Sequence, residues 1–351
     1  MGVDDHEGSV MTRTLSVCIP TFNRRELLEK TLESLNNQTF QDYEIIVCDD
    51  CSTDGTWEFL RSLKWPNLKV LRNEHNLHLP GNMTRLFKEV SSKYVGMQHD
   101  HDLYSPVFIE RMIDLMEQHP SAGFGCCAYH LLDDDGCIGD PDLYEFQLFP
   151  VGDLLPGREL VRVLATRIHT PIPAMSTVFR RDVVEKAGGY RSDWGLAADE
   201  DLYRRVTSIS DVAYCRERLF IMRFRPQERR SIMGSWKGLY TVYELRHDIT
   251  ENDLHETSLF RIANKARLTV SMYKALLMES LVLWSYGEKA NLKKALDMKT
   301  IRHGKKVLNP FSRLLAYVWI GFLSATSGYG RSLGAAWRQR KRLHETQKGT
   351  N

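Results

Sequence analysis

The sequence lacks any long apolar run, and this absence argues against a chain that spans a membrane. The closest approach, LLAYVWIGFLSAT at residues 314–326, is shorter than the roughly 20 apolar residues that cross a bilayer. The opening residues, MGVDDHEGSV, also lack the charged-then-apolar pattern of a secretion signal. Residues 1–13 are therefore predicted to be a disordered lead, and the expected location is cytoplasmic.

Paired cysteine spacings are scarce as well. The chain has seven cysteines, an odd number, and Cys48 and Cys51 form a C-x-x-C pair with no second Cys or His pair at ligand spacing. Such a pair alone is a weak indication of zinc. Scattered cysteines fit a reducing compartment better than a disulfide framework. The adjacent carboxylates Asp49 and Asp50 are therefore the more informative part of this segment.

Charge of one sign is not in excess, because the formal net charge is only +2. Basic residues nevertheless gather at the C-terminus, where Glu345 is the acidic exception. This end is expected to be either a solvated basic tail or a surface for an anionic partner or a membrane. No nucleic-acid partner is expected. The basic residues are Arg331, Arg338, Arg340, Lys341, Arg342 and Lys348.

Short apolar runs alternate with amphipathic segments from Leu15 onward, which is typical of a mostly parallel sheet with helices on its faces. Strand signals end near residue 235, and helical patterns follow. We therefore predict an α/β domain at residues 14–234 and a helical C-terminal region at residues 235–351. Strands are predicted at 15–20, 43–48, 68–73, 94–98, 123–129 and 175–179, and helices at 23–38, 56–63, 80–93 and 106–118.

Polar residues at strand ends are candidate ligand groups, since ligands of open parallel sheets bind beyond the carboxyl ends of the strands. Asp50 follows the second predicted strand and could accept a hydrogen bond from a base N–H or a ribose hydroxyl. Alternatively, Asp49 and Asp50 only cap the next helix. After the first strand, Thr21 or Asn23 could cap the helix that follows.

The run LSVCIPTFNRRELLEKTLESLNNQTFQDYEIIVCDDCSTDGT resembles the opening of family 2 glycosyltransferases, and the resemblance extends to about Arg230. It implies a GT-A fold, a Rossmann-like nucleotide-sugar-binding fold, and sugar transfer with inversion. The nucleotide-sugar contacts that the resemblance implies are Pro20, Thr21, Asn23, Asp50 and, in the segment PGNMTR, Asn82.

The segment QHDHD after the fourth strand resembles the DXD region of this family. It implies an Mn or Mg ion held by Asp100, His101 and Asp102, with Asp100 also close to the donor. The more usual D-x-D-D arrangement would fall on His99 to Asp102, so two positions often filled by Asp hold His. Either His101 binds the metal as an imidazole, or Asp102 replaces it. A purely structural role for these polar groups is the alternative.

A base is needed to remove the proton from the attacking acceptor hydroxyl. The segment GLAADEDLYRRV resembles the family pattern E-D-x-x-L-x-x-R, which implies that Asp199 is this base, with Glu200 and Asp201 as alternatives. Ala198 stands where Glu is common. Acids at a helix start also interact favourably with the helix dipole, which is the ordinary explanation. Trp194, just upstream, could stack on an acceptor sugar or simply pack in the core.

Two arginines complete the predicted site. The segment LFIMRFRPQERRS resembles a strand and loop in which Arg-x-His lies beside the diphosphate, so Arg223 matches and Arg225 stands in for His. Equally, these arginines could face solvent. The loop-like stretch Asp133–Gly157 and the helical C-terminal region are expected to bind the acceptor.

The resulting hypothesis is a metal-dependent, inverting hexosyltransferase that uses a UDP-sugar in preference to a dTDP- or GDP-sugar. The expected acceptor is a saccharide or lipid-linked saccharide in polysaccharide or glycolipid assembly. Peripheral contact of the protein with the cytoplasmic membrane face and assembly into an oligomer are open alternatives. A nucleotidyltransferase would need a Gly-rich phosphate loop, which PTFNRRE lacks. A non-catalytic nucleotide-sugar-binding relative or partner protein is the main alternative, because His99, His101 and Ala198 replace acids.

Overall fold

A computed structural model describes residues 13–132, 138–139, 152–167, 172, 174–223 and 236–268. The predicted lead and most of the stretch Asp133–Gly157 lie outside these residues. The chain divides into two compact units, one of residues 1–163 and 169–225 and one of residues 164–168 and 226–351.

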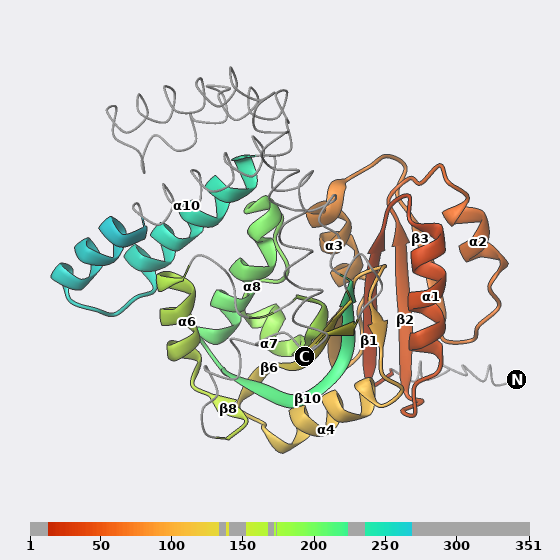
Figure 1. Cartoon of the computed structure of the whole chain (residues 1–351), viewed down its shortest axis with the longest axis horizontal. Helices are drawn as coiled ribbons and strands as arrows, with labels where there is room; N and C mark the ends of the chain where they lie inside the picture. The colour runs from red at the N-terminus through yellow and green to blue at the C-terminus, as the bar shows by residue number, and fades with distance from the viewer. Residues whose placement is uncertain are drawn as a thin grey trace, which may run out of the picture. The chain divides into compact units, whose positions relative to one another are not determined.

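The first unit is built on one sheet with the strand order β3-β2-β1-β4-β9-β6-β10-β5. Figure 1 labels β1, β2, β3, β6, β8 and β10 of this sheet. β1, β2, β3 and β4 pair in parallel, as do β6 and β10, whereas β9 is antiparallel to both β4 and β6. The strands are β1 (Leu15–Thr21), β2 (Tyr43–Asp49), β3 (Leu68–Arg72), β4 (Tyr94–Met97), β5 (Leu103–Tyr104), β6 (Ala122–Leu132), β7 (Ile138–Gly139), β8 (Leu154–Leu155), β9 (Thr177–Arg180) and β10 (Asp211–Arg223).

Helices cover both faces of this sheet. Val178 of β9 belongs to the buried cluster that contains Leu32 and Met112, whereas Phe179 stacks with Tyr203. Successive strand residues point to opposite faces, so the two clusters lie on opposite sides. The helices of the unit are α1 (Arg25–Asn36), α2 (Thr56–Ser62), α3 (His78–Lys88), α4 (Phe108–Gln118), α7 (Arg181–Lys186) and α8 (Ala198–Thr207), with the short 3-10 turns η1 (Ala174–Ser176) and η2 (Gly195–Ala197). The helix α6 (Gly157–Thr166) begins in this unit, and its residues 164–166 belong to the second unit.

The start of α1 differs from the sequence prediction. Its N-cap is Arg24, and the helix has no side-chain cap, so the prediction that Thr21 or Asn23 caps it is wrong. Asn23 has a left-handed backbone with φ 51°, a conformation that Asn tolerates better than most residues. This turn directs the Asn23 side chain away from α1, and its partners are described below.

The described residues of the second unit are mainly helical. They include α10 (Trp236–Asn252) and a further helix at residues 258–268. Asn264 donates to the Ala165 carbonyl over 3.1 Å, and buried Arg246 donates to the Arg167 carbonyl over 2.7 Å. No helix in the described parts of the chain is both long and apolar enough for a membrane span. The basic C-terminus falls outside the described residues.

Candidate active site

The carboxyl ends of β1, β2, β3 and β4 meet at one edge of the sheet because these strands are parallel. β10 also ends there, since the backbone N–H of Arg223 donates to Asp102 Oδ1 over 2.9 Å. This edge, which we call the carboxyl edge, holds most of the predicted site residues. Segments separated by up to 121 residues in sequence therefore meet there.

Asp50 lies at this edge in a network of amides. Its Oδ1 accepts hydrogen bonds from Asn73 Nδ2 over 2.6 Å and from the Leu77 N–H over 2.8 Å. Asn82 Oδ1 lies 3.2 Å from Asn73 Nδ2, and Asn82 Nδ2 donates to the Cys48 carbonyl. Asp50 Oδ2 makes no hydrogen bond with the described residues. The network thus fixes the carboxylate by one oxygen and leaves the other available as an acceptor.

The C-x-x-C pair does not form a metal site in this structure. Burial raises the pKa of the Cys48 thiol to about 12, and its sulfur packs 3.7 Å from Asn73 Oδ1. Within the described residues, the group of side chains able to hold an ion contains no cysteine. Cys48 is thus a packed side chain, and the interpretation of this segment as a carboxylate site stays a prediction.

Asn23 connects the loops that follow β1 and β2. Its backbone N–H donates to Ser52 Oγ over 2.9 Å, and its Oδ1 accepts the Thr53 N–H over 2.8 Å. Pro20 and Thr21 end β1 and pair with β2. The Thr21 hydroxyl is buried and has no hydrogen-bond partner in the described structure. Asn23 therefore shapes the loop, and the Thr21 hydroxyl is a polar atom that a ligand could satisfy.

Asp100 forms an ion pair that the sequence did not predict. Arg24 Nη1 lies 2.9 Å from Asp100 Oδ1 and 3.0 Å from His101 Nδ1, and His101 Nδ1 lies 3.0 Å from the same Asp100 oxygen. Burial alone would raise the pKa of Asp100, but the His101 hydrogen bond and the Arg24 charge lower it to about 2. Asp100 is thus a carboxylate held by a guanidinium and an imidazole.

Asp102 and His99 leave buried polar atoms unmatched. Asp102 Oδ2 and His99 Nδ1 have no hydrogen-bond partner in the part of the chain that the structure describes, and they lie 3.8 Å apart. Burial raises the pKa of Asp102 to about 6. Burial also lowers the pKa of His99 well below its usual range, with a smaller effect from His101. A neutral imidazole therefore faces a carboxylate oxygen that has no hydrogen-bond partner among the described residues.

These residues fit a divalent cation. His99, His101 and Asp102 each offer a ligand atom, and the three atoms lie within 4.8 Å of one another. Imidazole nitrogens and carboxylate oxygens are ordinary ligands of divalent transition ions. The predicted metal ligands His101 and Asp102 are thus brought together, while Asp100 has Arg24 as its partner. The role of Asp100 as a metal ligand stays a prediction.

Arg223 ends β10 beside Asp102. Its Nε is buried and has no hydrogen-bond partner among the described residues. An unmatched guanidinium N–H at this edge is suited to an anionic oxygen, since charge-assisted bonds to phosphate are among the stronger hydrogen bonds. The predicted partner Arg225 lies outside the described residues.

The three acids of α8 differ in their surroundings. Asp201 is 2% exposed and pairs with Arg205 over 2.8 Å and with Arg204 over 3.6 Å. Glu200 is also buried. Asp199 is partly exposed, and its Oδ1 accepts the Glu200 N–H over 2.9 Å. Of these carboxylates, Asp199 is the one best suited to exchange a proton with a ligand.

The segment before α8 is held against α3. Phe87 of α3 contacts the Tyr190 ring with centroids 5.2 Å apart, and η2 contacts the same helix. Arg205 donates to the carbonyls of Ala187 and Gly189, which fixes the start of this segment. Trp194 precedes η2 and is half-buried. The segment that carries Tyr190 and η2 therefore packs beside the helix that carries Asn82, and α8 with Asp199 follows η2 directly.

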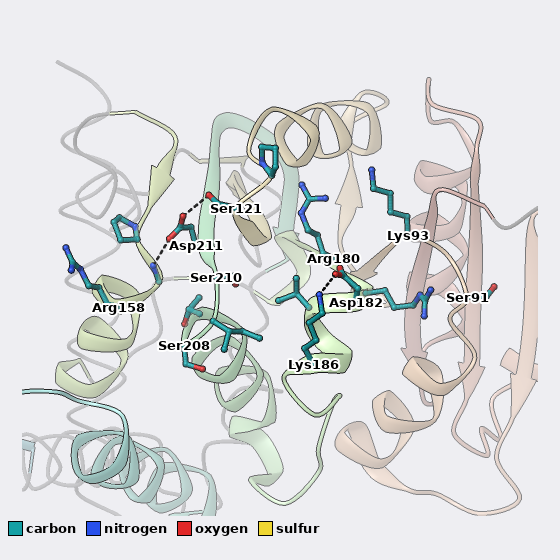
Figure 2. Close-up of a pocket in the computed structure, with 17 residues that line it drawn as sticks. Ser91, Lys93, Ser121, Arg158, Arg180, Asp182, Lys186, Ser208, Ser210 and Asp211 are labelled. Carbon is teal, nitrogen blue, oxygen red and sulfur yellow. Dashed lines mark hydrogen bonds and ion pairs between the residues drawn. The ribbon is translucent and has the colours of Figure 1, made fainter.

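A groove of about 1130 Å³ opens at the other edge, where β4, β6 and β10 begin (Figure 2). Arg180 lines it and donates to the Ala122 carbonyl, the Tyr94 hydroxyl and the carbonyls that end α4. Asp211 accepts from Ser121 Oγ over 2.7 Å and from the Gly157 N–H over 3.3 Å. Other charged groups pair as Lys186 with Asp182, Lys93 with Glu117 and Arg181 with Glu185. None of the groove residues leaves a buried side-chain polar atom unmatched within the described structure.

Sequence reasoning missed three residues of the carboxyl edge. Arg24 directly follows Asn23, the last residue of the predicted nucleotide loop, and no role was predicted for it. Asn73 follows β3 directly, so its position at a strand end was a usable signal. His99 was seen only as a replaced acid, although imidazole is itself a metal ligand.

Known proteins resemble this chain in sequence and in structure. The sequence pattern described as "Glycosyl transferase family 2" matches residues 16–188. Residues 16–188, just under half of the chain, therefore form a glycosyl transferase family 2 domain. The match covers β1 to α7, and therefore includes the Asp50 network and the His99–Asp102 segment.

The sequence matches to three relatives each cover 25% to 30% of this chain. A GalNAc(5)-diNAcBac-PP-undecaprenol beta-1,3-glucosyltransferase of Campylobacter jejuni is 40% identical over 91 residues, which is 25% of this chain and 29% of that protein. Matches to relatives of this kind cover 29% to 41% of the relatives' own lengths.

Solved structures extend the likeness to nearly the whole chain. S. aureus TarS 1-349 in complex with UDP-GlcNAc has a TM-score of 0.56 at 16% identity, covering 93% of this chain and 92% of that one. The mannosyltransferase PcManGT from Pyrobaculum calidifontis, in complex with GDP-Man and Mn²⁺, has a TM-score of 0.51 at 12% identity, covering 94% and 87%. The predicted GT-A fold, a central sheet flanked by helices, is confirmed.

Proposed function

We propose that this protein is an inverting glycosyltransferase that moves a hexose from a UDP-sugar to an acceptor hydroxyl, with a bound divalent cation. The observation that supports it is the carboxyl edge itself: Asp50, the His99–Asp102 segment and Arg223 meet there, within a family 2 domain. Buried atoms at that edge lack partners and suit a ligand carrying both hydrogen-bonding and anionic groups.

The donor nucleotide would bind between the first two strand ends. Asp50 Oδ2 can accept the N–H of a uracil base while Oδ1 stays bound to Asn73 and Leu77. The Thr21 hydroxyl and the Asn82 amide network border the same region. UDP is preferred over dTDP and GDP, although proteins of similar fold include one bound to UDP-GlcNAc and one bound to GDP-Man.

The reaction needs one base and a stabilised leaving group. Asp199 would take the proton from the acceptor hydroxyl as its oxygen bonds to the anomeric carbon, and the bond from that carbon to the diphosphate oxygen breaks with inversion. The electron pair leaves with the diphosphate, which Arg223 can contact through its unmatched Nε. A cation held by His101, Asp102 and their neighbours would neutralise the developing negative charge.

The acceptor would be a saccharide or a lipid-linked saccharide. The name of the Campylobacter relative describes transfer onto an undecaprenol-linked saccharide, which supports this class. Trp194 can present a ring face to the apolar side of a sugar. A cytoplasmic enzyme that meets the membrane peripherally would be suited to such an acceptor.

The test is a sugar-transfer assay with the full-length protein. UDP-, dTDP- and GDP-sugars are each incubated with Mn²⁺ or Mg²⁺ and a panel of free and polyprenyl-linked saccharides, and products are identified by mass and by anomeric configuration. We expect product from a UDP-sugar with inverted configuration, and loss of product in Asp199→Asn. Binding of nucleotide sugars without transfer to any acceptor would instead indicate the non-catalytic alternative.

A further inference from the structure

We propose that the cation site of this chain is a two-imidazole, one-carboxylate site made by His99, His101 and Asp102, and that it selects divalent transition ions over Mg²⁺. The position of this ion beside a donor rests on the proposed function. Binding of the ion alone does not.

The geometry brings three ligand atoms together. His99 Nδ1 lies 3.8 Å from Asp102 Oδ2, and His101 Nε2 lies 3.9 Å from Asp102 Oδ1. Ligands of one ion at about 2.0–2.2 Å stand roughly 3 Å apart when adjacent. The three ligand atoms lie within 4.8 Å of one another, so side-chain rotations that close gaps of at most about 1.8 Å would complete the set.

The unmatched atoms point to a cation rather than to a structural cluster. Asp102 Oδ1 is already bound to the Arg223 N–H, whereas Asp102 Oδ2 and His99 Nδ1 are buried without a partner. Buried polar atoms are nearly always satisfied in folded proteins. An ion between these two atoms would satisfy both at once.

Asp100 acts in this arrangement as a positioning residue. An ion bound at His101 Nε2 requires the ring proton on Nδ1, and Asp100 Oδ1 lies 3.0 Å from Nδ1, ready to accept it. A carboxylate that orients a metal-bound imidazole in this way also raises its basicity. Arg24 Nη1 would then keep its hydrogen bond to Asp100 and lose its contact with His101, since a donor cannot face a protonated Nδ1.

The ligand types determine the selectivity. Mg²⁺ prefers oxygen ligands in a strict octahedron and retains its water, whereas imidazole suits Co²⁺, Zn²⁺ and related ions. Affinity for nitrogen-containing sites rises from Mn²⁺ through Co²⁺ to the later ions. Replacement of two carboxylate positions by His99 and His101 therefore shifts preference away from Mg²⁺.

The experiment uses metal-stripped, full-length protein without nucleotide or acceptor. Mn²⁺, Co²⁺, Zn²⁺ and Mg²⁺ are titrated separately by calorimetry, and Co²⁺ is also followed by its visible absorption, which reports nitrogen ligation. We expect Co²⁺ to bind at least about tenfold more tightly than Mg²⁺. His99→Ala and His101→Ala should each weaken Co²⁺ binding at least about tenfold, and exposed His255→Ala should leave it unchanged.

Replacing both histidines by aspartate tests the selectivity directly, and it keeps the proposal testable if the alanine variants do not fold. The double variant His99→Asp with His101→Asp should lose the Co²⁺ preference and bind Mg²⁺ more tightly than the natural chain. Asp100→Ala should lower Co²⁺ affinity by about 10–100-fold, with partial recovery in Asp100→Glu. A structural role would instead lower the melting temperature without changing the Co²⁺ spectrum.

Equal affinity for Mg²⁺ and Co²⁺, or Co²⁺ binding unaffected by loss of His99, would overturn the proposal. These outcomes are separate from failure of sugar transfer, because no donor is present in the titrations. Selective Co²⁺ binding by a protein that transfers no sugar would leave the site intact and refute only the proposed function.

Discussion

The carboxyl and amino edges of the same sheet are both densely polar, but they differ in how their polar atoms are matched. At the amino edge, the groove of Figure 2 has Arg180 bound to several carbonyls and Asp211 bound to Ser121 and Gly157. At the carboxyl edge, Thr21, His99, Asp102 and Arg223 each leave a buried atom without a partner in the described structure.

This difference separates a structural surface from a binding site better than size does. The amino-edge groove is large at about 1130 Å³, yet its charges are already paired within the protein. Unmatched buried groups are unfavourable in the free protein and become favourable when a ligand satisfies them. The contrast predicts that substitutions at the carboxyl edge change binding and turnover, while those at the amino edge change stability.

The largest effect is expected for the proposed base. Asp199→Asn retains the shape of the side chain but cannot take a proton, so sugar transfer should fall by about 10²–10⁴-fold. The measurement is kcat for transfer at saturating donor. The matched control is Asp193→Asn, an exposed acid in the segment just before α8, which should transfer at the natural rate. Unchanged kcat in Asp199→Asn would refute the base assignment.

A smaller effect is expected for donor recognition by Asp50. Asp50→Asn can still accept from Asn73 and Leu77 through Oδ1, but an NH₂ replaces the free acceptor. Donor affinity should fall by about tenfold to 100-fold, equivalent to about 1.4–2.8 kcal/mol, with little change in melting temperature. Calorimetric titration of UDP measures it. Equal UDP affinity in the two proteins would contradict the proposed role of Asp50.

At the amino edge, Arg180→Met should affect stability instead. The substitution keeps the aliphatic volume but leaves the carbonyls of Ala122 and Met116 without their donor, so the free energy of unfolding should fall by about 2 kcal/mol. Denaturant unfolding measures the loss. The folded fraction should transfer sugar with the kcat of the natural protein. A loss of kcat without a loss of stability would show that this edge participates in the reaction.

The smallest effect is expected for the exposed pair at the same edge. Lys186→Ala removes an ion pair with Asp182 in which both side chains are well exposed, and such pairs contribute less than about 0.5 kcal/mol. Neither the unfolding free energy nor UDP affinity should change measurably. Weaker UDP binding in Lys186→Ala would overturn the distinction between the two edges.

Local sequence patterns predicted the first part of the fold well. Alternation of apolar and amphipathic segments located β1, β2, β3 and β4, because each strand and the next helix are specified by neighbouring residues. The antiparallel insertion of β9 between β4 and β6 was not predicted. Its pairing depends on residues that are distant in sequence, which no local pattern encodes.

The contacts within the candidate site could not be predicted from the sequence. The segment 99–102 was found because acids and imidazoles cluster after a strand, whereas the pairing of Arg24 with Asp100 joins residues 76 apart in sequence. Asn23 illustrates the same limit. Its type suggested a helix cap, but its left-handed backbone turns it toward Thr53 of another loop.

The most direct test is hydrogen–deuterium exchange of the intact protein with and without UDP and Mn²⁺, because one experiment compares both edges. We expect UDP and Mn²⁺ to slow amide exchange in peptides that contain residues 18–25, 48–54 and 97–103, at the ends of β1, β2 and β4. We expect no change in peptides that contain residues 119–121 and 207–211, which line the groove. Protection of the groove peptides, with the carboxyl edge unchanged, would contradict this expectation.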